Sequence, residues 1–266
     1  MNIEIVKRTS TTNTTACSPR KPQYIAIHYT AGVTSKAGSA ANTAAWFAKP
    51  EAQASADFIV DDATFVQFNP DPLTRYCWAV GAKAKNPYTK GGSLFGICKN
   101  ANSISIEICS TNRTGKMTQA NDDNYSFTDK AVENGAKLTA YLMETYGIDI
   151  DHVVRHYDVT GKLCPGIVGW NADSGSEDAW KDFLARVRHY AGQDNQKKEE
   201  STVDRYNALS EIPTFAKPTI LKMIHKGFLN GYGTKKDADG LPADLDLSVD
   251  MIRVFVTLDR AGAYGD

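Results

Sequence analysis

The sequence has no long hydrophobic run and no large excess of charge of either sign. No window reaches the ~18 apolar residues that a membrane span requires, and residues 1–19 contain no apolar signal-peptide core. The 30 Lys and Arg residues nearly balance the 31 Asp and Glu residues, so the net charge is -1. These absences argue against a membrane span and against nucleic acid as a partner, which would need a strongly basic face. We therefore expect synthesis in the cytoplasm without a signal peptide, and release by another route before any action outside.

Cysteine is scarce and its spacing excludes the common structural metal sites. The five cysteines are Cys17, Cys77, Cys98, Cys109 and Cys164. No two of them form a CxxC pair, which excludes a zinc-ribbon or a thioredoxin-like motif. Because a chain made in the cytoplasm rarely forms disulfides, the first four are expected to be buried or half-buried free thiols.

Aliphatic residues almost disappear over residues 192–205. This segment, GQDNQKKEESTVDR, holds one aliphatic residue and many charges, a composition typical of linkers. We therefore predict a larger domain over residues 1–191, a linker over residues 192–204 and a small helical domain over residues 205–266.

The larger domain alternates strand patterns with helix patterns. Strands are expected in QYIAIHYT, ADFIVDDATFVQF, NSISIEICS and DHVVRHY. Helices are expected in SAANTAAWFAK, TDKAVENGAKLTAYLMETYG and SEDAWKDFLARVRHYAG. The second helix should begin after Thr128 and end at Gly147. This alternation predicts the α/β class, with a central mixed β-sheet flanked by helices.

Residues 155–166, RHYDVTGKLCPG, place a histidine and a cysteine close together at the end of a predicted strand. Seven residues separate His156 from Cys164, and Gly161 allows the chain to bend between them. Neutral imidazole and thiolate are both ligands of Zn²⁺, but a catalytic zinc needs a third protein ligand. The pair alone is a weak signal, since a polar surface loop has the same composition. Asp158 either hydrogen-bonds His156 or shapes the turn.

His28 is the candidate third ligand. It ends the strand pattern YIAIHY, and strand ends that lie side by side can direct two imidazoles into one cleft. His152 is left out, because residues four apart on a strand lie ~13 Å from each other. His189, in an amphipathic helix, and His225, beyond the linker, are expected to be ordinary surface or core residues.

Five motifs stand in an order typical of one enzyme family: YIAIHYTAG, SADFIV, RYCWAVG, NSISIEIC and RHYDVTGKLCPG. With them the chain resembles the zinc-dependent N-acetylmuramoyl-L-alanine amidases of the type-2 amidase family, which are related to phage lysozyme-amidases and peptidoglycan-recognition proteins. The resemblance implies a zinc cleft in the mixed sheet, with one Zn²⁺ held by His28, His156 and Cys164. It also implies that the partner is bacterial peptidoglycan, cleaved at the amide between N-acetylmuramic acid and L-alanine.

Hydrolysis of this amide needs a proton acceptor and a hydrogen-bond or proton donor beside the metal. Glu107 fits the acceptor role, because it lies on the strand face opposite the isoleucines; the alternative is an exposed strand carboxylate. Lys162 fits the donor role, because it lies between two predicted ligands in the sequence; the alternative is a solvated loop lysine. Two positions differ from the family pattern: Ala56 replaces a catalytic Tyr of phage members, and Ala79 replaces a His of many relatives. Because the catalytic Tyr is missing, the assignment of Glu107 as the proton acceptor is favoured.

The segment after the linker resembles one S-layer homology repeat. It holds a helix pattern, the Gly-rich turn KGFLNGYG, an Asp-rich loop and a second helix pattern after Ser248. The stretch DADG lacks EF-hand spacing and is interpreted as a polar turn. The resemblance implies binding to a secondary cell-wall polymer, with homo-oligomer formation as the runner-up. Because a lone helix pair buries little surface, we expect this segment to dock on the catalytic domain or to self-associate.

The preferred interpretation of the whole chain is a phage or prophage endolysin, or an autolysin, that acts at the bacterial cell wall. The alternative is a non-catalytic peptidoglycan-binding protein. Non-catalytic relatives lose a metal ligand, most tellingly the cysteine. This chain has all three predicted ligands, which favours the enzyme.

Overall fold

The computed structural model describes residues 3–119, 122–192 and 205–265. The chain divides into two compact units, residues 1–194 and residues 195–266. The predicted linker, residues 192–204, lies outside the described residues except for Gly192. Within the described part of the chain, no helix combines the length and the apolar character that crossing a membrane requires.

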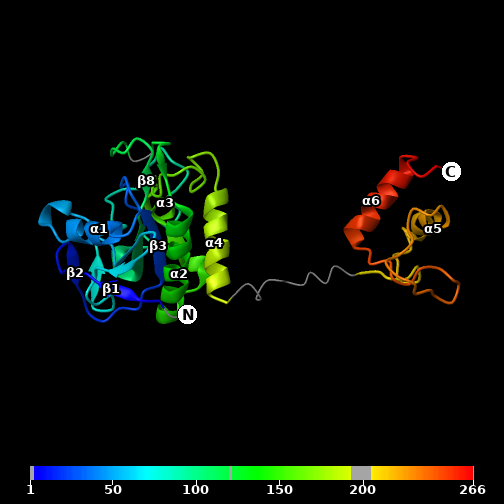
Figure 1. The fold of residues 1–266 in the computed structure, drawn as a ribbon, viewed down its shortest axis with the longest axis horizontal. Helices are drawn as coiled ribbons and strands as arrows, with labels where there is room; N and C mark the ends of the chain where they lie inside the picture. The colour runs from blue at the N-terminus through cyan, green and yellow to red at the C-terminus, as the bar shows by residue number, and fades with distance from the viewer. Residues whose placement is uncertain (1–2, 120–121, 193–204, 266) are drawn as a thin grey trace. The chain divides into compact units, whose positions relative to one another are not determined.

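A six-stranded mixed sheet forms the centre of the first unit, as the sequence predicts (Figure 1). Its strand order is β1-β5-β4-β7-β3-β10. Strands β4, β7, β3 and β10 run parallel to one another, whereas β1 and β5 run the opposite way. The bounds are β1 Ile5–Lys7, β3 Tyr24–Tyr29, β4 Phe58–Val60, β5 Phe65–Gln67, β7 Ser103–Ile108 and β10 Val153–Arg155. Two short antiparallel pairs are separate from it: β2 Thr14–Ala16 with β6 Arg75–Cys77, and β8 Thr111–Asn112 with β9 Tyr125–Ser126.

The alternating pattern of β3 and β7 gives the sheet two chemically different faces. The isoleucines of both strands lie in the largest hydrophobic core: Ile25, Ile27, Ile104, Ile106 and Ile108. His28 is in parallel register with Glu107 on the neighbouring strand. Because successive side chains of a strand point to opposite faces, His28 and Glu107 share the face opposite the isoleucines.

Two helices, α2 (Asp129–Tyr146) and α4 (Asp178–Tyr190), cover the isoleucine face (Figure 1). The Thr128 hydroxyl caps α2 by accepting a hydrogen bond from the backbone N–H of Ala131 at 3.1 Å. Gly147, with a φ of 64°, ends the helix in the left-handed conformation. Both ends of α2 therefore match the prediction. The buried side chains of α4 are Trp180, Phe183 and Val187, which belong to the predicted stripe.

The opposite face is covered by α1 (Ser39–Phe47), by α3 (His156–Thr160) and by loops. The buried side chains of α1 pack with β4 and β5 in a second core. Val159 of α3 packs with Ala26 of β3 in a third, smaller core. Three short 3-10 helices complete this unit: η1 Pro50–Ala52, η2 Asn100–Asn102 and η3 Ile150–His152.

Helix α3 corrects one prediction about local structure. The strand pattern DHVVRHY was expected to run through His156, but the strand β10 ends at Arg155 and His156 is the first residue of α3. The cause is Asp158, whose carboxylate accepts a hydrogen bond from the backbone N–H of Arg155 at 2.8 Å. A carboxylate in the first turn caps a helix and stabilises its start.

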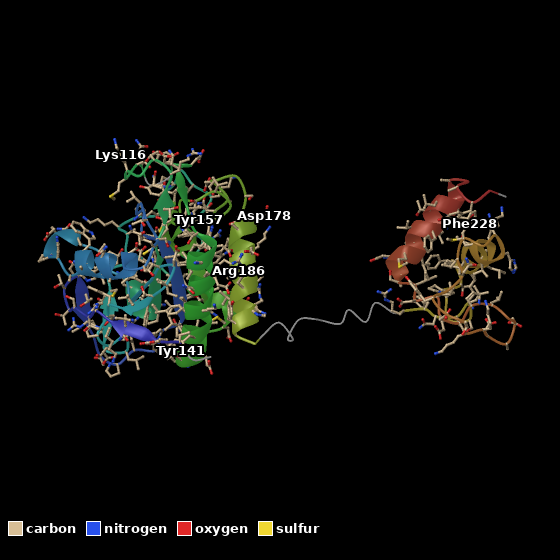
Figure 2. All side chains as sticks on the ribbon, in the orientation of Figure 1. Lys116, Tyr141, Tyr157, Asp178, Arg186 and Phe228 are labelled. Atoms are coloured by element: carbon tan, nitrogen blue, oxygen red, sulfur yellow. The ribbon has the colours of Figure 1, made fainter. Side chains whose placement is uncertain are left out.

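The second unit is built on α5 (Lys217–His225) and α6 (Val249–Arg260). Ser248 caps α6 by accepting a hydrogen bond from Met251 N at 3.2 Å. Its core is Ile212, Ala216, Ile220, Met223, Leu245, Leu247, Ile252 and Val256. In the Gly-rich turn, Gly231 has a φ of +74° and lies against the Asp244 carboxylate, leaving no room for a Cβ atom. Phe228, within the same turn, is exposed (Figure 2).

Candidate metal centre

Two neighbouring segments carry the predicted histidines to one place. His28 is the fifth residue of β3, and β10, which ends one residue before His156, pairs with β3 in parallel. Register places Arg155 beside Ile27, so His156 follows next to His28. Parallel strands end at the same edge of a sheet, and this edge brings the two imidazoles together.

Cys164 reaches the same place because the chain turns back after α3. Gly161, with a φ of 75°, ends α3, and a Cβ atom on it would lie 2.6 Å from Thr89 Oγ1. The backbone N–H of Tyr157 then donates to the carbonyl of Cys164 at 2.9 Å. This bond holds the returning loop against the first turn of α3, beside His156.

The three predicted ligands lie together, and all are buried. Nδ1 of His156 is 3.2 Å from Nδ1 of His28, and Sγ of Cys164 is 3.7 Å from the same His28 atom. One ligand atom from each residue lies within 4.8 Å of the others. Among the described residues, this is the single group of three or more His, Cys, Asp or Glu side chains with such a spacing.

The two distances to Nδ1 of His28 are close to those expected around one tetrahedral Zn²⁺ ion. With Zn–N of about 2.0–2.1 Å and Zn–S of about 2.3 Å, tetrahedral ligands lie about 3.3 Å (N to N) and about 3.6 Å (N to S) apart. Burial, aided by the charges of nearby cations, lowers the pKa of His28 and brings that of His156 to about 3. Both imidazoles are therefore neutral, as metal ligands must be. Burial also raises the pKa of Cys164 to about 12, a shift that a bound divalent cation opposes.

The predicted catalytic residues lie beside this cluster. Glu107 is half-buried as a residue. Its carboxylate oxygen Oε2 is buried and has no hydrogen-bond partner among the described residues. Burial raises the pKa of Glu107 to about 8, and the positive charge of Lys162 opposes that rise. Lys162 is exposed and lowers the pKa of both histidines. The structure thus brings Glu107 and Lys162 to the same site as the three predicted ligands.

The histidines that the sequence leaves out lie elsewhere. His152 ends η3, not a strand, and its ring lies edge-on to Tyr24 with centroids 5.1 Å apart. His189 and His225 are exposed on α4 and α5. None of these three histidines belongs to the His28–His156–Cys164 group found among the described residues. The strand geometry used to exclude His152 is wrong, because His152 ends η3.

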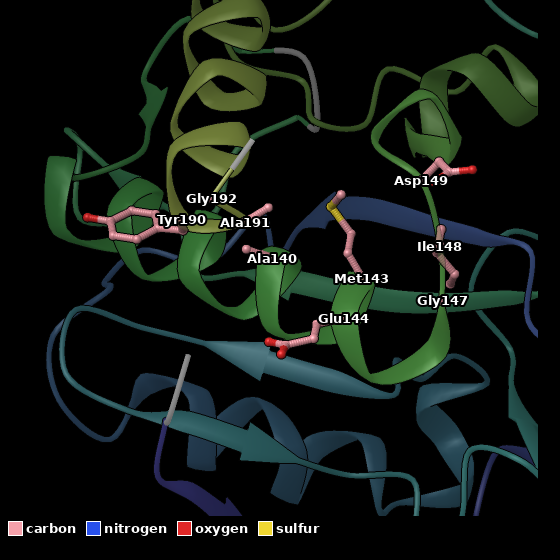
Figure 3. A pocket seen from close by; sticks show the side chains of 9 residues that line it. All are labelled: Ala140, Met143, Glu144, Gly147, Ile148, Asp149, Tyr190, Ala191 and Gly192. Atoms are coloured by element: carbon pink, nitrogen blue, oxygen red, sulfur yellow. The ribbon is translucent and has the colours of Figure 1, made fainter. Parts of the chain in front are cut away.

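A cleft of about 410 Å³ opens at the cluster, and His156, Lys162 and Trp78 are among its lining residues. Ala79, at the position where relatives carry a histidine, also lines it, whereas Ala56 is fully buried. A larger pocket of about 590 Å³ lies where α2 and α4 end (Figure 3). Its lining, which includes Met143 and Tyr190, contains none of the predicted site residues. The smaller cleft is therefore the candidate active site, because predicted site residues line it and none lines the larger pocket.

The family model described as N-acetylmuramoyl-L-alanine amidase (Amidase_2) matches residues 18–167, more than half of the chain. The chain belongs to this amidase family. The matched range contains all three predicted ligands and both predicted catalytic residues. The family assignment thus rests on the part of the chain that builds the cleft.

Curated amidases share only part of their length with this chain. N-acetylmuramoyl-L-alanine amidase CwlA of Bacillus subtilis (strain 168) is 31% identical over 148 residues, which are 56% of this chain and 44% of the relative. N-acetylmuramoyl-L-alanine amidase CwlL of Bacillus licheniformis is 37% identical over 75 residues, 28% of this chain and 17% of the relative. The chain therefore spans less than half the length of these relatives.

Two solved structures are similar over most of the chain. The structure of the catalytic domain of XlyA is 28% identical and covers 70% of this chain and 99% of that chain, with a TM-score of 0.48. A mutant endolysin from Bacillus subtilis has the same identity, coverage and TM-score. In both, the match includes nearly all of the solved chain.

One feature of this candidate site was not predicted from the sequence, namely the ion pair behind His156. The Arg155 guanidinium donates to the Asp158 carboxylate through Nε at 2.9 Å and Nη2 at 2.6 Å. Its Nη1 donates a hydrogen bond to Glu177 at 2.6 Å, and its Cζ lies over the Trp180 ring, 5.0 Å from the ring centroid. Of the two roles considered for Asp158, the structure thus shows the turn-shaping one, fixing the start of α3 and hence the direction of His156.

We expect Asp158→Asn to weaken zinc binding by about tenfold, the low end of the cost of losing a group bonded to a metal ligand, because Asp158 acts on His156 through the start of α3. The amide cannot accept both guanidinium bonds and still cap α3, so His156 loses its fixed direction. Chelator competition on the full chain measures the affinity. The matched control is Asp178→Asn, which removes an exposed i,i+3 pair with Lys181 on α4. Unchanged affinity in Asp158→Asn would contradict the positioning role.

Proposed function

We propose that this protein is a zinc-dependent hydrolase that cleaves the amide between N-acetylmuramic acid and L-alanine in peptidoglycan. The observation that carries the proposal is the convergence of two neutral imidazoles and one thiol, of which His156 lines a cleft. Membership of the amidase family supports the choice of bond. We infer a cell-wall-lytic role, as an endolysin or an autolysin, with peptidoglycan as the main partner.

His28, His156 and Cys164 would hold the ion. When bound, Zn²⁺ supplies a Lewis acid that makes water acidic enough to attack near neutral pH and polarises the amide carbonyl. Glu107 accepts the proton of the attacking water, since burial keeps its proton affinity in the range useful near neutral pH. Lys162, on the wall of the cleft, donates a hydrogen bond to the negative charge that develops on the amide oxygen. The proton held by Glu107 then passes to the leaving nitrogen of L-alanine.

Product analysis tests this function directly. Incubation of purified bacterial cell walls with the full chain should release peptides with a free N-terminal L-alanine and leave intact glycan strands. A zinc chelator should stop the release, and added Zn²⁺ should restore it. Mass spectrometry of the fragments identifies the bond. Free peptides without glycan cleavage support the amidase; new reducing sugar ends or cuts within the peptide contradict it.

The second candidate function is peptidoglycan binding without catalysis. It predicts that the full chain sediments with cell walls but releases no peptide at any zinc concentration. The three convergent ligand side chains favour the enzyme, because a pure binding protein has no use for a neutral His-His-Cys cluster beside a cleft.

For the second unit we propose binding to a secondary cell-wall polymer, on the basis of its resemblance to one S-layer homology repeat. Two helices, α5 and α6, with a Gly-rich turn and an Asp-rich loop support that resemblance. The stretch DADG forms a turn in which Asp237 Oδ1 accepts from Asp239 N and Leu241 N at 3.0 and 2.9 Å. The alternative is self-association through this unit.

Deletion of residues 201–266 separates these two roles. If the unit binds the wall, we expect the truncated chain to sediment with cell walls several-fold less than the full chain, at unchanged native mass. If the unit is an oligomerisation element, native mass spectrometry should instead show the full chain as an oligomer and the truncated chain as a monomer. If the full and truncated chains sediment equally with cell walls and have the same oligomeric state, both roles are contradicted.

A further inference from the structure

The four tryptophans of the chain fall into two groups by exposure. Trp170 and Trp180 are buried in the core between the sheet and α4, at 3% and 7% exposed. Trp46 and Trp78 are exposed, at 48% and 41%. Of these two exposed tryptophans, only Trp78 is among the residues that line the cleft with His156 and Lys162. An apolar ring of this size facing solvent in an active-site cleft needs an explanation other than packing.

Hydrogen bonds hold the indole of Trp78, its backbone and the backbone of the next two residues in place. Its Nε1 donates to Thr15 Oγ1 at 2.8 Å. Its backbone N–H donates to Ser55 Oγ at 3.1 Å, and its carbonyl accepts from Ser55 N at 3.2 Å. The next two backbone N–H groups both donate to Asn100 Oδ1, at 3.1 and 2.7 Å. The indole is therefore fixed before any ligand arrives, and little side-chain entropy is lost when one binds.

The chemistry of the cleft suits a pyranose ring. A sugar presents C–H groups on its ring faces and hydroxyl groups around its edge, so one face can pack on a flat indole. The floor beside Trp78 is made of small residues, Ala79, Gly81 and Ala82, which leave room for a ring. Gln53, on the same cleft, can bond polar groups at the edge of the sugar.

We propose that Trp78 is the platform on which the N-acetylmuramic acid ring stacks, and that it makes the enzyme select an acyl group carrying a sugar. This inference rests on the proposed function and adds a specificity-determining residue to it. Stacking acts on the bound substrate and its transition state alike, because the sugar ring takes no part in the reaction. It therefore affects KM and leaves kcat nearly unchanged.

Two soluble substrates with the same scissile amide test the platform. One is N-acetylmuramoyl-L-alanyl-D-isoglutamine, and the other is the same peptide acylated with D-lactate alone. With the first, Trp78→Ala should raise KM about tenfold at unchanged kcat, the size expected for one aromatic contact. With the lactyl peptide, the same variant should match the parent within about twofold. Trp78→Phe should restore most of the loss on the sugar substrate.

Trp46→Ala is the matched control, because Trp46 is equally exposed but lies on α1 and does not line the cleft. It should change neither substrate. Calorimetric titration of the muramoyl dipeptide into zinc-loaded Glu107→Gln, with and without Trp78→Ala, measures the same contact without turnover. An equal effect of Trp78→Ala on both substrates, or no effect on binding, would overturn the platform. If the parent binds the sugar through Trp78 but releases no peptide, the proposed function fails and the platform stands.

Discussion

Glu107→Gln is expected to lower the rate of amide hydrolysis by about 10²–10⁴-fold, the contribution of a positioned general base. Glutamine has nearly the shape of glutamate and cannot accept a proton. The substitution breaks no protein hydrogen bond at Oε2, because that atom has no partner among the described residues. Peptide release from cell walls measures the rate, and elemental analysis should show the same zinc content as in the parent.

The control for this variant lies on the same strand face. Ser105→Ala changes a buried side chain two residues before Glu107, and it should keep both zinc and near-full activity. If Glu107→Gln retains near-full activity, another group takes the proton. If Glu107→Gln loses zinc as well as activity, Glu107 supports the metal rather than the water.

The sheet and much of the site could be predicted because their signals are local and periodic. The alternation Ile104, Ile106, Ile108 fixes which face of β7 is buried, so Glu107 on the other face follows from sequence alone. The Thr128 and Gly147 caps likewise mark both ends of α2. Such patterns predict the structure well, because the face that is apolar in the sequence is the face that is buried in the fold.

The start of helix α3 was not predicted because it depends on one local side chain, Asp158, and the rest of the ion pair was not predicted because long-range contacts complete it. Val153 and Val154 favour a strand, and that preference is satisfied only as far as Arg155. The guanidinium of Arg155 is buried by Trp180 and bonded by Glu177, which lie more than 20 residues further along the chain. No pattern in the nearby sequence predicts such a partner. The sequence does not predict the exposure of Trp78 either, because most tryptophan side chains are largely buried in the core.

Cys164→Ser is expected to remove bound zinc and, with it, essentially all activity. A neutral hydroxyl is a poor substitute for a thiolate at a borderline-soft ion, and two imidazoles alone do not make a closed ligand set. The loss of affinity should exceed the about 100-fold cost of disturbing a partner behind a ligand. Metal analysis of the purified full chain measures zinc, and peptide release from walls measures activity.

Thermal unfolding gives a readout of this variant that does not depend on activity. A ligand that binds only the folded state at 100 times its Kd stabilises it by about 2.7 kcal/mol, so chelation should lower the Tm of the parent by several degrees. The Tm of Cys164→Ser should not respond to chelator, because it holds no ion to lose. Cys98→Ser makes the same chemical change at another buried cysteine, which packs with Val154 and Val159. It costs some packing, but its response to chelator should match the parent's, since its metal ligands are intact. A Cys164→Ser protein with stoichiometric zinc and a chelator-sensitive Tm would show that the sulfur is not a ligand.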